Sequence, residues 1–248
     1  MRDVARAAAI IRQRRSAVDM DGRTELSSDT FFGMLARTLP DRLHPPWTAI
    51  DFSARIHLCL FVHRIDGLAP GLYVLVRDAA RLDAFRAACH DQFAWEHVGS
   101  SDMPLYALTL GDCREAATQA SCFQEIAGHS AFSLGMVADF ARTLEENGAW
   151  AYRRLFWEAG LIGQVLYLEA EAAGVRSTGM GCYFDNIVHR LLDLDLSDDA
   201  WQSLYHFTVG GAVDDGRLTT LPAYGHLSSE RISPPWRGGM SKSVGRPT

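Results

Sequence analysis

Lysine is almost absent from this sequence. Lys242 is the only lysine, so arginine supplies nearly all of the positive charge. The body of the chain therefore has no amine for Schiff-base or general-acid chemistry. The formal net charge of -6 argues against nucleic acid or an anionic membrane as the main partner. Arginine suits bidentate binding of phosphate, so a local anion site remains compatible with this composition.

The sequence also lacks paired cysteines and long apolar runs. Its five cysteines are scattered and include no CxxC pair: Cys59, Cys89, Cys113, Cys122 and Cys182. We expect reduced thiols in a cytoplasmic protein rather than a disulfide framework. No run reaches about 18 uncharged apolar residues, and residues 1–16 lack the apolar core of a signal peptide. These absences predict a soluble protein.

Three common kinds of site lack their signatures. No serine lies in a G-x-S-x-G elbow, which disfavours covalent hydrolysis. The segment 179–182 (GMGC) lacks the third glycine of a dinucleotide-binding loop and follows a long helix instead of preceding one. Cys182, Asp185 and His189 lie close in sequence, but a metal site needs at least one further ligand. We interpret Asp185 as a helix N-cap and His189 as unrelated, and predict no metal.

The periodicity of apolar residues predicts one domain over residues 1–228, followed by a basic Pro/Gly-rich tail at 229–248. We expect helices over residues 2–14, 79–89, 117–128 and 186–194. A further helix should begin at a cap formed by Ser27 or Ser28 and end at Pro40. We expect strands at 55–63, 71–78, 103–111 and 201–211, and strand plus turn at 175–185. The first two strands form a hairpin or lie adjacent. Residues 131–140 fit either a helix or a strand.

Residues 152–174 predict a helix of about six turns that ends at Gly174. Its apolar residues cover nearly the whole circumference, which is typical of a core or a subunit interface. Glu158, Gln164 and Glu169 interrupt this surface, and a buried carboxylate needs a partner or a raised pKa. We expect ion pairs with Arg153 or Arg154 and a satisfied core glutamine; direct catalysis is the alternative. Four nearby aromatic residues belong to the core or stack on a flat ligand: Trp150, Phe156, Trp157 and Tyr167.

Two short motifs have both a functional and a structural interpretation. Arg14, Arg15 and Ser16 end the first predicted helix, and two guanidiniums with a hydroxyl suit a phosphate clamp. They also fit an ordinary basic turn. Gly179 and Gly181 permit close approach of the backbone to a flat ligand, or they form a tight turn.

The order of these features resembles the FMN-dependent nitroreductase superfamily, and most closely its SagB-type dehydrogenase branch. The similarity spans about residues 8–225 and is strongest over 152–211, which contains AGLIGQVLYLEAEAAG, TGMGCYFD and a late Val-Gly-Gly strand. It implies an α+β nitroreductase-like fold, with a central mixed or antiparallel sheet flanked by helices and a long buried helix at a dimer interface. The chain resembles the second-half domain of tandem members, so the partner is a second copy or a homologous domain.

The resemblance also implies a site. Arg14, Arg15, Ser16 and Arg217 would bind the phosphate and ribityl chain of FMN, and Gln164 would lie on the dimer-facing helix. Gly179, Gly181 and Cys182 would turn backbone groups toward the edge of the isoalloxazine near N5.

The implied function is an FMN-dependent oxidoreductase that transfers hydride with a small organic substrate, NAD(P)H or both. The alternative is a flavin-free scaffold or partner domain, and the first two of three departures from the family pattern motivate it. Val18 stands where the family often has Arg or Lys, and only residues 53–55 resemble the usual Ser/Gly-rich turn. Ala151-Tyr152 replaces the Lys-Tyr pair of azoline-oxidising members, which leaves Tyr152 as the only, weak catalytic candidate.

Overall fold

A computed structural model of the chain describes residues 2–40 and 45–225, with side chains described from Arg6 onward in the first helix. The chain divides into two compact units. One consists of residues 1–13 with 215–248, and its described part includes α1 (Arg2–Gln13). The other, residues 14–214, contains the sheet and the remaining helices. The expected tail at 229–248, with Lys242, lies outside the described residues.

The larger unit is built on a seven-stranded sheet with strand order β3-β4-β2-β1-β5-β7-β6. Every pairing within it is antiparallel, including the expected pair β1–β2. The strands are β1 (Ile56–Val62), β2 (Gly71–Leu75), β3 (Glu96–Val98), β4 (Leu105–Leu110), β5 (Phe132–Asp139), β6 (Arg176–Met180) and β7 (Trp201–Gly210). The predicted α+β class, with a central antiparallel sheet flanked by helices, is confirmed.

The helices of this unit are α2 (Ser28–Thr38), α3 (Leu82–Ala88), α4 (Arg114–Ala120), α5 (Glu125–His129), α6 (Phe140–Asn147), α7 (Tyr152–Ala172) and α8 (Asp185–Leu192). Short 3-10 turns occur at η1 (Trp47–Ala49), η2 (Ala79–Arg81) and η3 (Ala149–Ala151). Ser27 caps α2 as expected, by accepting the backbone N–H of Thr30. Within the described chain, no helix is both long and apolar enough to span a membrane.

Several predicted elements differ in detail. The single helix expected over 117–128 is two helices, α4 and α5, separated by a loop with Cys122 and Phe123 in the left-handed region. The ambiguous segment 131–140 is strand β5, buried along its whole length. Asp185 is the first residue of α8, and its N-cap is Phe184. The short strand β3 and helix α6 were not predicted.

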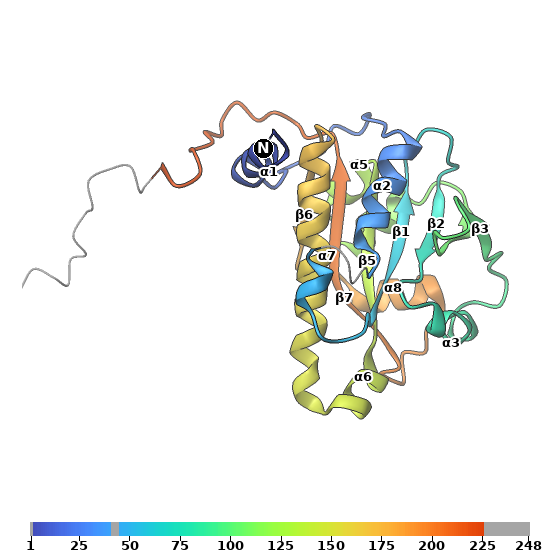
Figure 1. The fold of residues 1–248 in the computed structure, drawn as a ribbon. Helices are drawn as coiled ribbons and strands as arrows, with labels where there is room; N and C mark the ends of the chain where they lie inside the picture. The colour runs from blue at the N-terminus through green and yellow to red at the C-terminus, as the bar shows by residue number, and fades with distance from the viewer. Residues whose placement is uncertain (1, 41–44, 226–248) are drawn as a thin grey trace, which may run out of the picture. The chain divides into compact units, whose positions relative to one another are not determined.

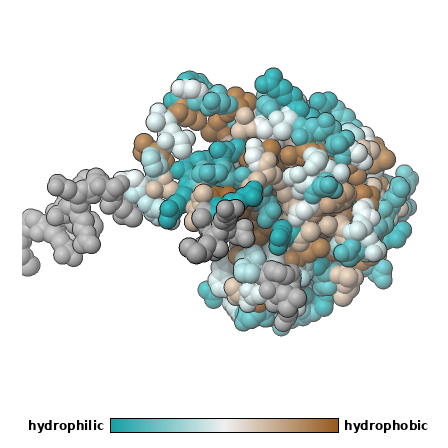
Figure 2. All heavy atoms as spheres, turned by 45° about the horizontal axis from the view of Figure 1, so that its top comes forward, coloured by the Kyte–Doolittle hydropathy of each residue, from teal (hydrophilic) through white to brown (hydrophobic). Residues whose placement is uncertain are grey.

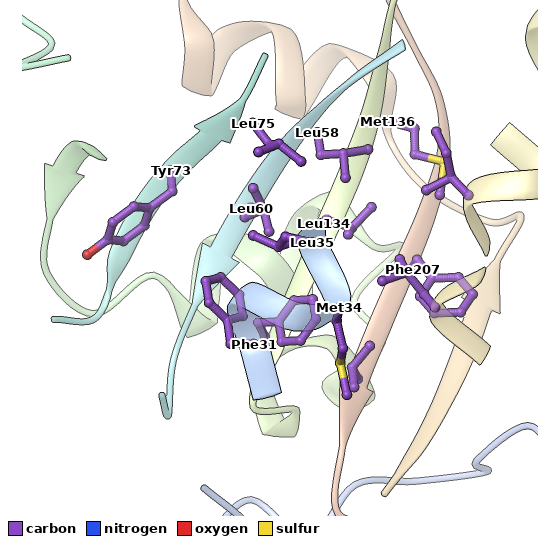
Figure 3. Packing of buried hydrophobic residues seen from close by; sticks show 14 of the residues in the cluster. Phe31, Met34, Leu35, Leu58, Leu60, Tyr73, Leu75, Leu134, Met136 and Phe207 are labelled. Atoms are coloured by element: carbon purple, nitrogen blue, oxygen red, sulfur yellow. The ribbon is translucent and has the colours of Figure 1, made fainter. Parts of the chain in front are cut away.

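Two hydrophobic layers cover the two faces of the sheet. One contains residues of α2 and α7 with one face of the central strands, as in Figure 3, where Phe31, Met34 and Leu35 of α2 pack near Leu58 and Leu60 of β1. The other contains residues of α3, α4, α5 and α8. Figure 1 shows α7 running beside the strands β6 and β7. Because the central strands are buried on both faces, they form nearly continuous apolar runs.

A buried ion pair joins α7 to the sheet. Glu158 and Arg77 contact each other with both side chains completely buried. The Glu158 carboxylate also accepts the backbone N–H groups of Arg55 and Ile56 over 2.9 and 3.4 Å. Arg77 donates to the carbonyl of Thr38, over 2.7 Å, at the end of α2. These contacts hold α7, β1 and α2 together.

The expected partners of Glu158 were therefore wrong. Arg153 is exposed. Arg154 is partly buried, and its guanidinium lies 3.9 Å from the carboxylate of Asp51 and 4.2 Å from the Trp150 ring centroid. A helix pattern identifies neighbours within one or two turns of the same helix. Arg77 comes from the segment after β2, 81 residues away in the chain.

We expect Glu158→Gln to lower the free energy of unfolding by about 3–5 kcal/mol, because it leaves the Arg77 guanidinium buried without its counter-charge. Replacing both partners, in Arg77→Met with Glu158→Leu, should cost less than the sum of the single changes. Urea unfolding of the parent, the two single variants and the double variant measures this double-mutant cycle. Additive losses would show that the two charges are not coupled.

Three buried histidines are held in the neutral form. Burial lowers the pKa of His57 to about 3 and those of His63 and His206 to about 4. Each ring has a polar partner: Nδ1 of His57 accepts the backbone N–H of Arg77, His63 contacts the carbonyl of Ala127, and His206 contacts the hydroxyl of Ser121. Among the described residues, Nε2 of His57 has no hydrogen-bond partner. Acid must therefore protonate these rings preferentially in the unfolded chain.

Stability should consequently fall as the pH drops from about 6.5 toward about 4, because the folded-state pKa values lie below the ordinary value of 6.5. Each histidine contributes at most about 1.4 kcal/mol per pH unit. His206→Gln should reduce this slope by about one proton, as measured by urea unfolding at several pH values. An unchanged slope in the variant would contradict the assignment of His206.

Candidate functional site

The two motifs singled out in the sequence lie side by side. Ser16 forms a parallel bridge with Ser177 of β6. Ala17 donates its backbone N–H to the Ser177 carbonyl over 3.0 Å, and Thr178 donates its hydroxyl to the Ala17 carbonyl over 2.6 Å. The fold thus places the arginine-containing turn against the strand that leads into the glycine segment, although Ala17 and Thr178 are 161 residues apart.

Tyr167 of α7 connects the two motifs. Its hydroxyl lies 2.8 Å from the Ser16 hydroxyl and accepts the backbone N–H of Gly179 over 2.9 Å. The Arg14 guanidinium lies over the Tyr167 ring, 5.2 Å from its centroid, which is a favourable cation–π distance. The sequence predicted a role only for the aromatic ring of Tyr167. No pattern indicated the role of its hydroxyl, because the partners lie on other elements.

A cavity of about 190 Å³ lies beside Tyr167, between α7 and β7. Its lining residues are Phe156, Ala159, Gly160, Gly163, Gln164, Tyr167, Tyr205 and Phe207. Gln164 supplies an amide to a wall that otherwise consists of aromatic rings, alanine and glycine. A flat aromatic ligand can stack on such a surface. We call this space the Tyr167 cavity.

Two other cavities lie in the same unit. One of about 630 Å³ is lined by Gly22, His63, Arg64, Ala69, Pro70, Leu110, Gly111, Asp112 and Arg114. Another of about 210 Å³ is lined by Asp51, Phe52, Ser53, Arg55, Thr143, Asn147, Ala151, Arg154 and Leu155. None of the three cavities is lined by residues of the two motifs. The Tyr167 cavity is the one related to them, because Tyr167 lines it and contacts both motifs.

Arg14 provides an unused donor next to this cavity. Within the described chain, its buried Nε has no hydrogen-bond partner, and neither has the buried hydroxyl of Ser177. A buried polar group without a partner is costly, and a ligand that completes its hydrogen bonds removes that cost. Arg15 donates to the Arg14 carbonyl over 2.7 Å and so braces the turn. This donor set fits an anionic group such as a phosphate.

The two glycines of the segment have different environments. A Cβ at Gly179 would lie 2.0 Å from the hydroxyl oxygen of Tyr205, so packing inside the protein already requires glycine there. The Gly179 N–H is donated to Tyr167, and a ligand would have to compete for it. Gly181 is exposed, and a Cβ there would meet nothing within 4 Å. Room for a close ligand therefore exists at Gly181 rather than at Gly179.

The expectation that every cysteine is a free thiol was wrong. Cys182 forms a disulfide with Cys122, with their Cα atoms 5.8 Å apart. The other three cysteines are free: Cys59, Cys89 and Cys113. Their sequence spacing could not reveal the pair, because it joins the α4–α5 loop to the turn after β6 across 60 residues.

The remaining candidate positions are dispersed. Val18 is exposed at 58%. Residues 53–55 lead into β1, and the Arg55 N–H is taken by Glu158. Tyr152 lies at the start of α7, where its ring packs edge-on against Phe140 and Phe156. Arg217 belongs to the smaller unit, where its guanidinium pairs with Asp215 over 2.7 Å.

Asp185 and His189 have separate partners. Asp185 accepts from the side chain of Gln202 over 3.1 Å, whereas the buried His189 accepts the backbone N–H of Ser203 over 3.1 Å. Across residues 2–40 and 45–225, no three His, Cys, Asp or Glu side chains are grouped so that they could hold a metal ion.

The model of the nitroreductase family matches residues 70–211. Among solved structures, a protein of Anabaena variabilis assigned as a nitroreductase has a TM-score of 0.65 at 18% identity, over 85% of this chain and 39% of that one. The E. coli microcin synthetase McbBCD complex has a TM-score of 0.58 at 17% identity, over 82% and 71%. Nitroreductase A of Vibrio parahaemolyticus has a TM-score of 0.51 at 11% identity, over 92% of this chain and 76% of that one. No curated protein matches the chain.

The family match covers more than half of the sequence, so this chain belongs to the nitroreductase family. Members of this family are generally oxidoreductases that use a flavin. At identities below a fifth, the solved structures show the fold alone. The chain spans only 39% of the length of the Anabaena protein.

Gly179→Ala should lower the free energy of unfolding by about 1–3 kcal/mol, because the new methyl group overlaps the Tyr205 hydroxyl. The matched change Gly181→Ala should stay within about 0.5 kcal/mol, since it points into open space. Adding Tyr205→Phe to Gly179→Ala should recover part of the loss. Equal costs for the two alanine variants, measured by urea unfolding, would be inconsistent with this packing.

Proposed function

We propose that the chain binds one FMN with its phosphate at Arg14, Arg15 and Ser16 and its ring system at the Tyr167 cavity. The observation that carries the proposal is the unused, buried Nε of Arg14 beside a cavity walled by aromatic rings and glycine. A guanidinium and a hydroxyl match a phosphate, and the aromatic wall matches a flat ring. Arg217 is proposed as a second phosphate ligand.

When bound, FMN supplies two-electron chemistry at its N5 position. The protein residues bind and orient it. Arg14 compensates the phosphate charge, and Tyr167 holds the arginine-containing turn against β6. The backbone N–H groups of Gly181 and Cys182 are proposed to face the ring edge, and Gln164 to contact it from α7. The aromatic wall excludes water from the ring face.

The proposed reaction is hydride transfer with a small organic substrate, with NAD(P)H or with both in turn. Azoline oxidation by a Lys-Tyr pair is not proposed, because Ala151 is buried and carries no amine. Tyr152 does not line the Tyr167 cavity, although its ring packs against Phe156, which does. The flavin-free scaffold is the competing function, and the exposed Val18 and the capped Gly179 N–H favour it.

We further propose that a second copy, or a homologous domain, covers the outer side of α7. The first half of this helix exposes Phe156 at 39% and Trp157 at 54%, and Trp150 just before it is exposed at 48%. On the face that it draws, Figure 2 shows hydrophobic residues at the surface among hydrophilic ones. Family members are commonly dimeric. Pairing along α7 would bury these rings and could complete the open side of the Tyr167 cavity.

Arg14→Ala should weaken FMN binding roughly ten- to hundredfold, which corresponds to loss of one charge-assisted phosphate contact of about 1.5–3 kcal/mol. Quenching of FMN fluorescence during titration measures the Kd. Arg190→Ala, at an exposed position on α8, is the matched control and should leave the Kd unchanged. Equal affinity of the Arg14 variant and the control would remove the phosphate role of Arg14. If the parent chain binds no FMN at all, the scaffold function replaces the proposal.

Trp157→Glu should convert a dimer into a monomer, because it places a charge in the proposed apolar interface. Light scattering measures the mass of the particle in solution. Leu196→Glu, at a position that is 52% exposed outside α7, should leave the mass unchanged. A parent chain that is a stable monomer at all concentrations would disprove pairing of two copies.

A further inference from the structure

The Cys122–Cys182 disulfide holds the more accessible cysteine sulfurs of the described chain. Cys182 is exposed and Cys122 is partly exposed. Cys59 and Cys89 are buried, and burial raises the pKa of Cys89 to about 12. Burial also raises the pKa of the half-buried Cys113 to about 11, so its thiol is poorly reactive. Sulfur chemistry with a ligand or a solute is therefore concentrated at the disulfide.

The loop that contains Cys122 is held in an unfavourable backbone conformation. Cys122 and Phe123 both have positive φ values, 61° and 57°, which non-glycine residues adopt at a cost. External contacts keep the loop in place. Gln124 donates its side-chain amide to the Cys182 carbonyl over 3.0 Å, and Phe184 donates its N–H to the Ala120 carbonyl over 2.8 Å. The loop can therefore relax when the cross-link opens, while these hydrogen bonds keep it close to the turn.

The disulfide lies close to the proposed flavin site. Gly179 touches Tyr167 through its N–H, and Cys182 follows three residues later, which is at most about 10 Å along an extended chain. Gly181 between them faces open space. The other half of the pair is anchored nearby, because Ser121 contacts the buried His206 of β7 and Tyr183 stacks on the same ring. Both sulfurs thus belong to segments attached to β7 through His206, whose sequence neighbours Tyr205 and Phe207 line the Tyr167 cavity from the opposite face of the sheet.

We propose that Cys122 and Cys182 form a second two-electron redox centre that exchanges electrons with the flavin. The inference rests on the proposed function. In the reductive direction, the S–S bond accepts two electrons and two protons and breaks into two thiols. The electron donor is reduced flavin, which becomes oxidised; one proton accompanies the electron pair and the other comes from water. Cys122 and Cys182 would in this way pass electrons between the flavin and thiols or disulfides.

Two measurements on the FMN-loaded parent chain test this proposal. The first is thiol counting by alkylation and intact mass under denaturing, non-reducing conditions. We expect three alkylated cysteines before and five after anaerobic reduction with dithionite. The second is the electron count of that titration, followed by the flavin absorbance. The parent should take up four electrons per chain, and Cys122→Ser with Cys182→Ser should take up two. Cys113→Ser, which keeps the pair, is the control and should take up four.

The outcomes separate the two proposals. If flavin is bound but the parent takes up two electrons and still shows three thiols after full reduction, the redox role of the pair is wrong and the proposed function stands. Five thiols before reduction would also overturn the inference. If no flavin binds, the proposed function fails first, as a separate observation, and the inference fails with it. The parent chain alone decides these outcomes, so a poorly folded serine variant does not obscure them.

Discussion

A charged carboxylate inside a hydrophobic core requires a cation next to it, and Glu158 meets this requirement with Arg77 from the segment after β2. The pair fixes one position of α7 against β1 and the end of α2. Nine residues further along the same helix, about 14 Å away, Tyr167 reaches the arginine-containing turn and β6. Because both residues lie on one helix, the ion pair that fixes Glu158 also fixes the position of Tyr167 at the site. We therefore regard this ion pair as the contact on which the architecture depends.

The site itself is assembled by hydroxyl groups and backbone amides, not by charged pairs. Tyr167 joins Ser16 to Gly179, and Tyr205 fills the space that a side chain at Gly179 would need. This arrangement leaves the Nε of Arg14 as a buried donor without a partner among the described residues. A site whose residues are held in place by hydrogen bonds, and which keeps one hydrogen-bond donor without a partner, is suited to binding an anionic ligand.

The sequence predicted the elements that depend on local pattern. The long helix, the Ser27 cap and the pair β1–β2 follow from periodicity and turn residues. It could not predict contacts between distant segments, which include the Arg77 partner of Glu158, the disulfide and the two bonds of the Tyr167 hydroxyl. Gly179 illustrates the difference. The pattern marked it as a place for a ligand, whereas its absent side chain is needed by Tyr205.

The central claim is that this chain is a flavoprotein whose FMN occupies the Tyr167 cavity. The most direct measurement is the amount of FMN that the purified chain releases on heating, compared with the protein concentration. The account predicts a yellow protein with close to one FMN per chain. A colourless protein that also remains free of FMN after incubation with an excess of it would contradict the claim.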